Sequence, residues 1–201
     1  MVLFFISLMN CNNEKNSLVQ NIEKSIELSD YSKHHLEALN FVKQENLNTD
    51  FYYLIDMSLH SGKNRFFIYD FSTQQVVDKN VVTHGSCDKL ETNLTKRSKA
   101  KFSDLVDSHC SSKGKYKIGK RDYSSWGINV KYWLHGLEET NKSAEDRVVV
   151  LHSWEVVSNE EIYPRYSPLS WGCPAVSNVF MKKLDLQLQD VDKPVLLWII
   201  E

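Results

Sequence analysis

The sequence lacks a surplus of positive charge. Its 24 lysine and arginine residues are outnumbered by 26 aspartate and glutamate residues, for a formal net charge of −2. Proteins that bind nucleic acid usually carry a basic surplus that neutralises phosphates, so no nucleic-acid partner is expected. The sequence also lacks a glycine-rich phosphate loop and an internal repeat. Nothing therefore indicates ATP or NAD dependence, and we predict no cofactor.

Cysteine is scarce, and no two cysteines form a CxxC pair. The four are Cys11, Cys87, Cys110 and Cys173. Without paired spacing a zinc site is disfavoured, and no metal is predicted. A looser cluster of His84, Cys87 and His109-Cys110 leaves two alternatives open, a metal site or the wall of a groove. Cys87 and Cys110 would be free to pair in an oxidising compartment, but their spacing does not show whether they meet.

No hydrophobic run is long enough to span a bilayer. The longest at the N-terminus, residues 2–9, has the length of a secretory signal core, and residues 8–11 resemble a loose lipobox that ends at Cys11. We therefore predict a signal or lipoprotein-like segment and linker over residues 1–16, with lipidation of Cys11. The implied location is the periplasmic side of the cell envelope, with the protein anchored to the membrane. The alternative is an uncleaved apolar tail.

The remaining sequence has the composition of a soluble globular protein, with 42% hydrophobic and 25% charged residues. Helical spacing of apolar residues predicts N-terminal helices over 17–50. From residue 51 the pattern changes to strands, first an antiparallel meander at 51–56, 65–70, 75–77 and 81–83, then strands at 114–118, 128–134, 147–151 and 195–200. A helix is expected from Ser177, an N-cap candidate. Residues 51–201 are predicted to form one mainly β domain.

Two segments of this domain carry residues suited to chemistry. An apolar strand runs into His152, and a turn with Gly172 presents Cys173 21 residues later. A free thiol has a pKa of about 8.5 and is mostly protonated at neutral pH, so a neighbouring imidazole is needed to accept its proton. Gly172 would let backbone N–H groups near Cys173 face a developing oxyanion. The Ser153 carbonyl would orient the imidazole ring.

The motif Ser170-Trp171-Gly172-Cys173-Pro174-Ala175-Val176 resembles the L,D-transpeptidases of the YkuD type, in the branch that reads Ser-x-Gly-Cys-Pro-Ala-Val. The similarity extends over residues 51–200 and includes residues 111–116 and the stretch from Leu137 to Arg147. It implies a β-rich sandwich with short helices and a cysteine-dependent acyl transfer on peptidoglycan stem peptides. It also implies a set of site residues. These are Cys173 as nucleophile, His152 as base, Gly172 in the nucleophile turn, the backbone of Trp171 and Ser153 for the oxyanion or for orientation, and Ser170, Arg165, Ser112 and Gly114 for substrate binding.

Two positions depart from the family pattern. Trp171 replaces a histidine, and Ala175 replaces an arginine that is often found there, so two polar contacts with substrate are missing. Trp171 is expected to line the acyl pocket, and Arg165 to hold a carboxylate of the stem peptide. Two other functions remain open, an L,D-carboxypeptidase that uses water as the acceptor and a catalytically inactive wall-binding module. The oligomeric state is not predicted.

Overall fold

The computed structural model describes residues 31–87 and 97–201. The predicted signal-like segment, Cys11 and the first predicted helix lie outside these residues. The chain divides into two compact units, Met1–Asn40 and Phe41–Glu201. Helix α2 (Ser32–Gln44) lies in the region for which N-terminal helices are predicted. In the described part of the chain, no helix combines the length and the apolar character that crossing a bilayer would require.

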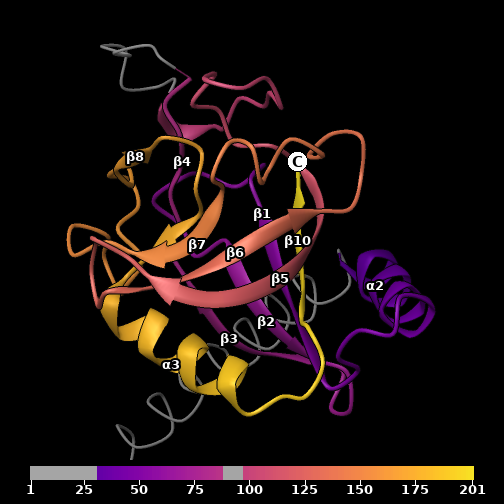
Figure 1. Cartoon of the computed structure of the whole chain (residues 1–201). Coiled ribbons are helices and arrows are strands. Elements are labelled where there is room, and N and C mark those ends of the chain that lie inside the picture. Colours follow the sequence, from indigo (N-terminus) through magenta and orange to yellow (C-terminus); the bar gives the residue numbers. More distant parts are fainter. Residues whose placement is uncertain (1–30, 88–96) are drawn as a thin grey trace, which may run out of the picture. The chain divides into compact units, whose positions relative to one another are not determined.

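The second unit is built mainly from β-strands, as predicted (Figure 1). Eight strands form one mixed sheet in the order β3-β2-β1-β10-β5-β6-β7-β9, and β4 pairs with β8 in a small parallel sheet. The strands are β1 (Phe51–Asp56), β2 (Phe66–Asp70), β3 (Gln75–Asn80), β4 (His84–Gly85), β5 (Gly114–Tyr123), β6 (Val130–Gly136), β7 (Val150–Ser153), β8 (Leu169–Ser170), β9 (Ala175–Val176) and β10 (Leu196–Ile200).

Three strands of the predicted meander are present as the antiparallel strands β1, β2 and β3. The fourth is absent, because residues 81–83 form no strand and the chain runs on into β4, which pairs in parallel with β8. Five of the six residues of β1 are buried, whereas exposure alternates along β3, the strand at the sheet edge. This difference follows from position, because a central strand is covered on both faces and an edge strand on one. The C-terminal strand β10 lies between β1 and β5 and runs parallel to β1. The first and last strands of this unit, β1 and β10, are therefore neighbours in the middle of the sheet.

The strand predicted at 147–151 begins later than expected. Val148 has a φ of +55°, outside the β region, and β7 starts at Val150. β7 then pairs in parallel with β9, so that His152 lies opposite Ala175 and Ser153 opposite Val176. This pairing brings the two segments singled out in the sequence side by side at one end of the sheet.

Helix α3 (Asn178–Gln189) follows β9 directly and starts where the sequence predicts. The Ser177 hydroxyl accepts a hydrogen bond from the Phe180 N–H at 3.0 Å, which satisfies one of the free donors at the helix start. Phe180, Met181 and Leu184 are buried in the main core. Figure 1 shows α3 below the sheet, with β4 and β8 above it.

Candidate active site

The turn that carries Cys173 depends on glycine. Gly172 has a φ of +108°, and a Cβ at this position would lie 2.7 Å from the carbonyl oxygen of Cys110. Any other residue would be strained in its backbone and would collide with a neighbouring backbone atom. The Ser170 hydroxyl closes the turn, because it donates to the Cys173 carbonyl at 2.7 Å and accepts from the Gly172 N–H at 3.2 Å.

This contact corrects one expectation. The Gly172 N–H is already engaged by Ser170 and does not stand free to face an oxyanion. The Ser170 hydroxyl also makes both of these bonds inside the turn, and its role in substrate binding stays a prediction. An oxyanion role for the backbone N–H of Cys173 or Trp171 stays a prediction.

Thr83 holds the other side of the turn, and the sequence analysis missed it. Its hydroxyl donates to the Cys173 carbonyl at 3.1 Å and accepts from the Ala175 N–H at 2.9 Å. The Thr83 N–H also donates to the Ala175 carbonyl at 2.9 Å. Thr83 is completely buried, so these bonds are shielded from water. The only signal in the sequence was a polar residue at the end of the apolar run before His84.

The Cys173 sulfur lies against the backbone that leads into β7. The Val150 N–H points at Sγ at 3.5 Å, and Sγ lies 3.7 Å from the Val148 carbonyl oxygen. The residue keeps partial exposure to solvent. Burial by the surrounding protein raises the pKa of the thiol above its ordinary value, and the Val150 N–H, Arg147 and Lys131 oppose this shift. The resting group is therefore a neutral thiol at neutral pH.

His152 is buried at the end of β7. Its Nδ1 lies 3.0 Å from the Ser153 carbonyl oxygen, the contact expected from the sequence. With Nδ1–H donating to this oxygen, the lone pair is on Nε2. Burial lowers the pKa of His152 below its ordinary value of 6.5, and the nearby Lys131 lowers it further, against the effect of the Ser153 carbonyl. His152 is thus a neutral base at neutral pH.

Lys131 is a second residue that the sequence analysis missed. It lies on β6 directly opposite His152 in the antiparallel β6–β7 pair. Its ammonium group lowers the pKa of both His152 and Cys173, although its own nitrogen also lies over the Trp133 ring at 4.9 Å. The residue type gave no clue to this role, because only the strand register brings Lys131 to the site.

The predicted substrate-binding residues fall into two groups. Ser112 and Gly114 are buried, Ser112 in contact with Tyr116 and Arg147, and Gly114 at a φ of +122° where a Cβ would lie 2.6 Å from Glu138 Oε2. Both positions therefore have a structural explanation. Arg165 is exposed in the loop before β8. Binding of substrate by any of these residues stays a prediction.

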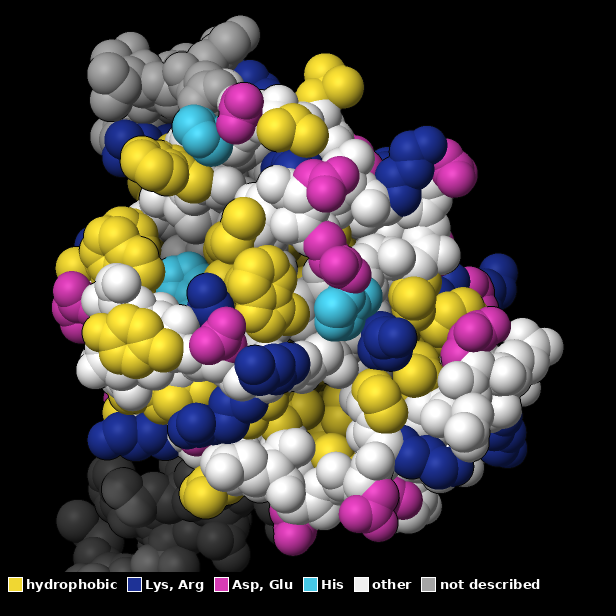
Figure 2. Space-filling view, in the orientation of Figure 1, with side chains coloured by type: hydrophobic (Ala, Val, Ile, Leu, Met, Phe, Trp, Pro, Cys, Tyr) yellow, Lys and Arg dark blue, Asp and Glu magenta, His cyan; other side chains and the backbone are white. Residues whose placement is uncertain are grey.

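The two positions that depart from the family pattern behave differently. Ala175 is completely buried in β9, so no arginine would fit there without displacing its neighbours. Trp171 is 77% exposed, and its ring stacks on His109 with centroids 4.9 Å apart. Figure 2 shows hydrophobic and histidine side chains gathered over the left part of this face.

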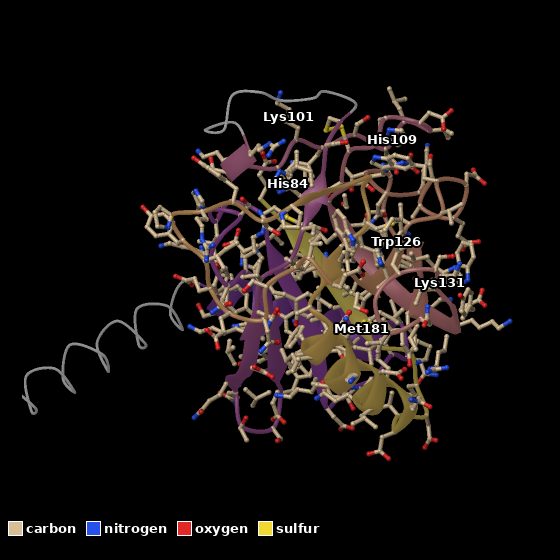
Figure 3. All side chains as sticks on the ribbon, turned by 90° about the vertical axis from the view of Figure 1, so that its left-hand side faces the viewer. His84, Lys101, His109, Trp126, Lys131 and Met181 are labelled. Atoms are coloured by element: carbon tan, nitrogen blue, oxygen red, sulfur yellow. A yellow bond between two sulfur atoms is a disulfide. The ribbon has the colours of Figure 1, made fainter. Side chains whose placement is uncertain are left out.

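A second aromatic pair lies beside His152. Trp154, two residues beyond it, packs edge-on against Trp126 with centroids 5.7 Å apart, and Trp126 is 53% exposed. The Ser153 hydroxyl accepts from the Ile128 N–H at 3.0 Å, which ties the Trp126 loop to the end of β7. In Figure 3 His109 lies above Trp126, and Lys131 lies below it. Exposed aromatic side chains therefore flank both candidate catalytic segments.

The cluster around His84 is not arranged as a metal site. Cys87 and Cys110 form a disulfide, and His109 stacks on Trp171. His84 Nδ1 lies 2.9 Å from Nη2 of the fully buried Arg65, and burial together with this guanidinium lowers the pKa of His84 to about 3. Within residues 31–87 and 97–201 no group of three or more histidine, cysteine or acidic side chains is placed to hold a metal ion.

Comparison with known protein families identifies one family for this chain. The family model described as the L,D-transpeptidase catalytic domain matches residues 22–196. The chain belongs to this family. The resemblance found in the motif around Cys173 is thus confirmed at the level of the family. A search of curated proteins found no match.

Solved structures with a similar fold include three from bacterial sources. Bd1075 of Bdellovibrio bacteriovorus is 15% identical, with a TM-score of 0.47, over 78% of this chain and 49% of that protein. The helical cell shape determining protein Pgp2 of Campylobacter jejuni is 13% identical, with a TM-score of 0.43, over 75% and 50%. An L,D-transpeptidase from Mycobacterium smegmatis is 11% identical, with a TM-score of 0.43, over 76% and 59%. The chain thus matches about half of the length of the first two.

Proposed function

We propose that this L,D-transpeptidase family member transfers an acyl group between amines of peptidoglycan stem peptides, through a thioester on Cys173 with His152 as general base. The observation that carries the proposal is the parallel pairing of β7 with β9. This register sets His152 opposite Ala175, two residues after Cys173, and the sulfur lies against the backbone of Val150 two residues before His152. A thiol and an imidazole on paired segments are the minimum for this chemistry.

The first half of the reaction forms the thioester. His152 Nε2 takes the thiol proton as Sγ attacks the carbonyl carbon at the L-centre of a diamino acid. The C–N bond to the following D-residue then breaks, and the imidazolium returns its proton to the leaving amine. Because the thiol and the imidazole are both neutral at rest, the proton moves during the attack and no preformed thiolate is required.

The second half transfers the acyl group. His152 removes a proton from an incoming amine, which attacks the thioester carbonyl. The C–S bond breaks, and the proton passes to the sulfur, which restores the thiol. With water in place of the amine, the same residues would act as an L,D-carboxypeptidase. The two exposed aromatic pairs beside His152 and Cys173 offer contact area for the donor and acceptor chains.

The test is the mass of the intact protein after incubation with a tetrapeptide muropeptide. We expect an adduct on Cys173 equal to the donor without its terminal D-residue, and a cross-linked product when an acceptor amine is added. Tripeptide product alone, in the presence of acceptor, would assign the carboxypeptidase. Absence of both adduct and product, in folded protein, would leave only the wall-binding module.

We also propose that the protein works in the cell envelope, anchored through a lipid on Cys11. The support is the pattern of residues 1–16 together with the Cys87–Cys110 disulfide, because structural disulfides persist in oxidising compartments. Cys11→Ala is expected to move the protein from the membrane fraction to the soluble fraction, as measured by immunoblotting of fractionated cells. Unchanged membrane association of the variant would contradict the anchor.

A further inference from the structure

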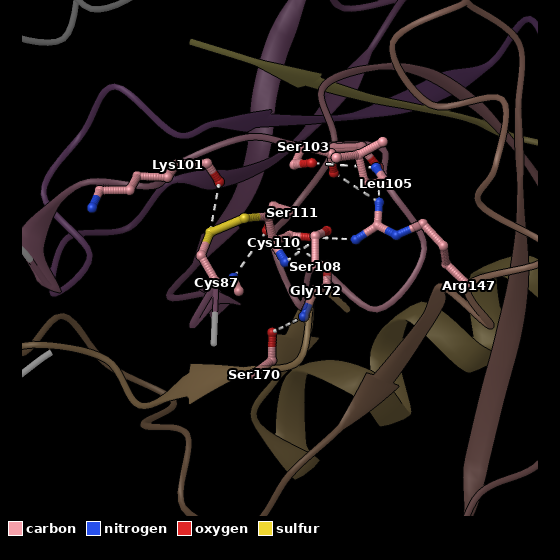
Figure 4. The surroundings of a disulfide bond; sticks show 12 residues. Cys87, Lys101, Ser103, Leu105, Ser108, Cys110, Ser111, Arg147, Ser170 and Gly172 are labelled. Atoms are coloured by element: carbon pink, nitrogen blue, oxygen red, sulfur yellow. Dashed lines mark hydrogen bonds between the residues drawn. A yellow bond between two sulfur atoms is a disulfide. The ribbon is translucent and has the colours of Figure 1, made fainter. Parts of the chain in front are cut away.

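Arg147 is a buried cation with an unusual number of partners next to the candidate nucleophile. Its side chain is 4% exposed. Nη1 donates to the Ser103 carbonyl and to the Ser112 hydroxyl, both at 3.0 Å, and lies 3.4 Å from Asp104 Oδ1. Nη2 donates to the Cys110 carbonyl. Figure 4 shows the guanidinium reaching this carbonyl from one side while the disulfide extends from the other.

The Cys110 carbonyl packs against the nucleophile turn. A Cβ on Gly172 would lie 2.7 Å from this oxygen and 3.2 Å from Arg147 Nη2. Gly172 therefore packs against the Arg147 guanidinium and the Cys110 carbonyl. Ser111 also contacts the turn, since its hydroxyl accepts from the Gly85 N–H at 3.0 Å and lies 3.5 Å from the Gly172 carbonyl oxygen.

The disulfide fixes the same carbonyl from the opposite direction. It joins Cys110 to Cys87, which follows β4, and the Cys87 N–H donates to the His109 carbonyl at 3.2 Å. Strand β4 in turn pairs with β8, the strand that enters the nucleophile turn. One short segment, residues 109–112, is thus held by Arg147 on one side and by the disulfide on the other. This segment contacts Gly172 and Trp171.

We propose that Arg147 is a positioning residue for Cys173. Arg147 holds the Cys110 carbonyl against Gly172, and the Cys87–Cys110 disulfide holds the same carbonyl from the other side. The inference deepens the proposed function, on which its effect on turnover rests. The reactivity of Cys173 then depends on the redox state of a different cysteine pair. Reduction of the disulfide by a dithiol releases one side of residues 109–112, while Cys173 itself is chemically unchanged.

Arg147 also contributes charge at the sulfur. Arg147 and Lys131 both lower the pKa of Cys173. His152 is the titratable group on β7, the strand that pairs with β9. Asp104 offsets part of the charge of Arg147. Loss of Arg147 therefore has two expected effects on the thiol, a higher pKa and a less ordered position.

The test measures alkylation of Cys173 by iodoacetamide against pH, read out on the Cys173 peptide by mass spectrometry, in folded protein. We expect Arg147→Met to move the alkylation midpoint to higher pH and to slow alkylation at pH 7 about tenfold, because the thiolate, which is the reactive form, becomes scarcer. Arg147→Lys, which keeps the charge but loses the fork of donors, should recover part of the rate. The matched control is Arg121→Met, which removes an exposed arginine paired with Asp185 and should change neither value.

A second arm tests the disulfide. The double variant Cys87→Ser with Cys110→Ser keeps the Cys110 backbone carbonyl and should slow alkylation in the same direction. When Arg147→Met is added to this double variant, the alkylation rate should fall by less than the product of the two separate fold-changes, since both changes act on residues 109–112. If Arg147→Met fails to fold, Ser112→Ala, which removes one partner of Arg147, should give a smaller shift of the same sign.

A purely structural role for Arg147 makes a different prediction, a lower melting temperature with an unchanged alkylation midpoint and rate, and that result would overturn the proposal. Failure of the proposed function is separate, because it would appear as wild-type protein that takes no acyl group from muropeptide while its alkylation still depends on Arg147.

Discussion

Cys173→Ala is expected to abolish acyl transfer and to leave the fold intact. The reaction needs a sulfur that attacks the carbonyl, and alanine offers no nucleophile. The cost to folding is small, because Cys173 is partly exposed and the hydrogen-bond contacts of its sulfur with Val150 and Val148 are long, at 3.5 and 3.7 Å. We expect product formation to fall to background and the free energy of unfolding to change by about 1 kcal/mol or less.

The measurement for this variant combines muropeptide product analysis with thermal unfolding. The adduct detected in the wild-type protein should be absent. Leu186→Ala, on the exposed side of α3, is the control for general effects of substitution and should react like wild type. Turnover by Cys173→Ala at the wild-type rate would refute Cys173 as the nucleophile.

His152→Asn is expected to slow acylation about 10²- to 10⁴-fold at neutral pH, the range typical for loss of a general base. Asparagine can still donate to the Ser153 carbonyl, so the variant removes the basic nitrogen while it keeps the local hydrogen bond. Single-turnover acylation, followed by the mass of the intact protein, gives this rate directly. A rate within a few-fold of wild type would exclude His152 as the base.

The pH dependence of these rates gives the same experiment a second readout. Because burial and Lys131 lower the pKa of His152, the wild-type base stays neutral above that value, and acylation should be lost only as pH falls below 6.5. Burial raises the thiol pKa, so in His152→Asn the thiolate forms only at alkaline pH. The rates of variant and wild type should therefore converge as pH rises beyond the thiol pKa. A constant ratio across the whole range would argue against proton transfer to His152.

Several features of the protein followed from local sequence patterns. Short-range preferences decide where a strand or a helix begins, and so the β1–β3 meander and the Ser177 cap were predictable. The motif around Cys173 pointed to the family, which the match over residues 22–196 confirmed. The backbone contact between His152 and Ser153 was also local, because it joins neighbours in the chain.

Other features depend on contacts between distant segments. No local pattern indicates that β10 enters the middle of the sheet, or that Lys131 lies opposite His152. The family resemblance implied a substrate contact for Ser170, and no local pattern indicated that its hydroxyl bonds to Gly172 and Cys173 inside the turn. Arg147 was noticed as part of a family pattern, but its partners span residues 103 to 112 and become neighbours only after folding.

The sequence alone thus determined the residue types that carry the chemistry, a thiol after a glycine and an imidazole at a strand end, because composition and nearest neighbours set these properties. Only the tertiary structure decided which groups surround them. The β7–β9 register, the Cys87–Cys110 disulfide and the buried guanidinium of Arg147 join segments 23 or more residues apart. Such contacts arise from packing of the whole sheet, and packing decides the burial and the nearby charges that shift the pKa values of Cys173 and His152.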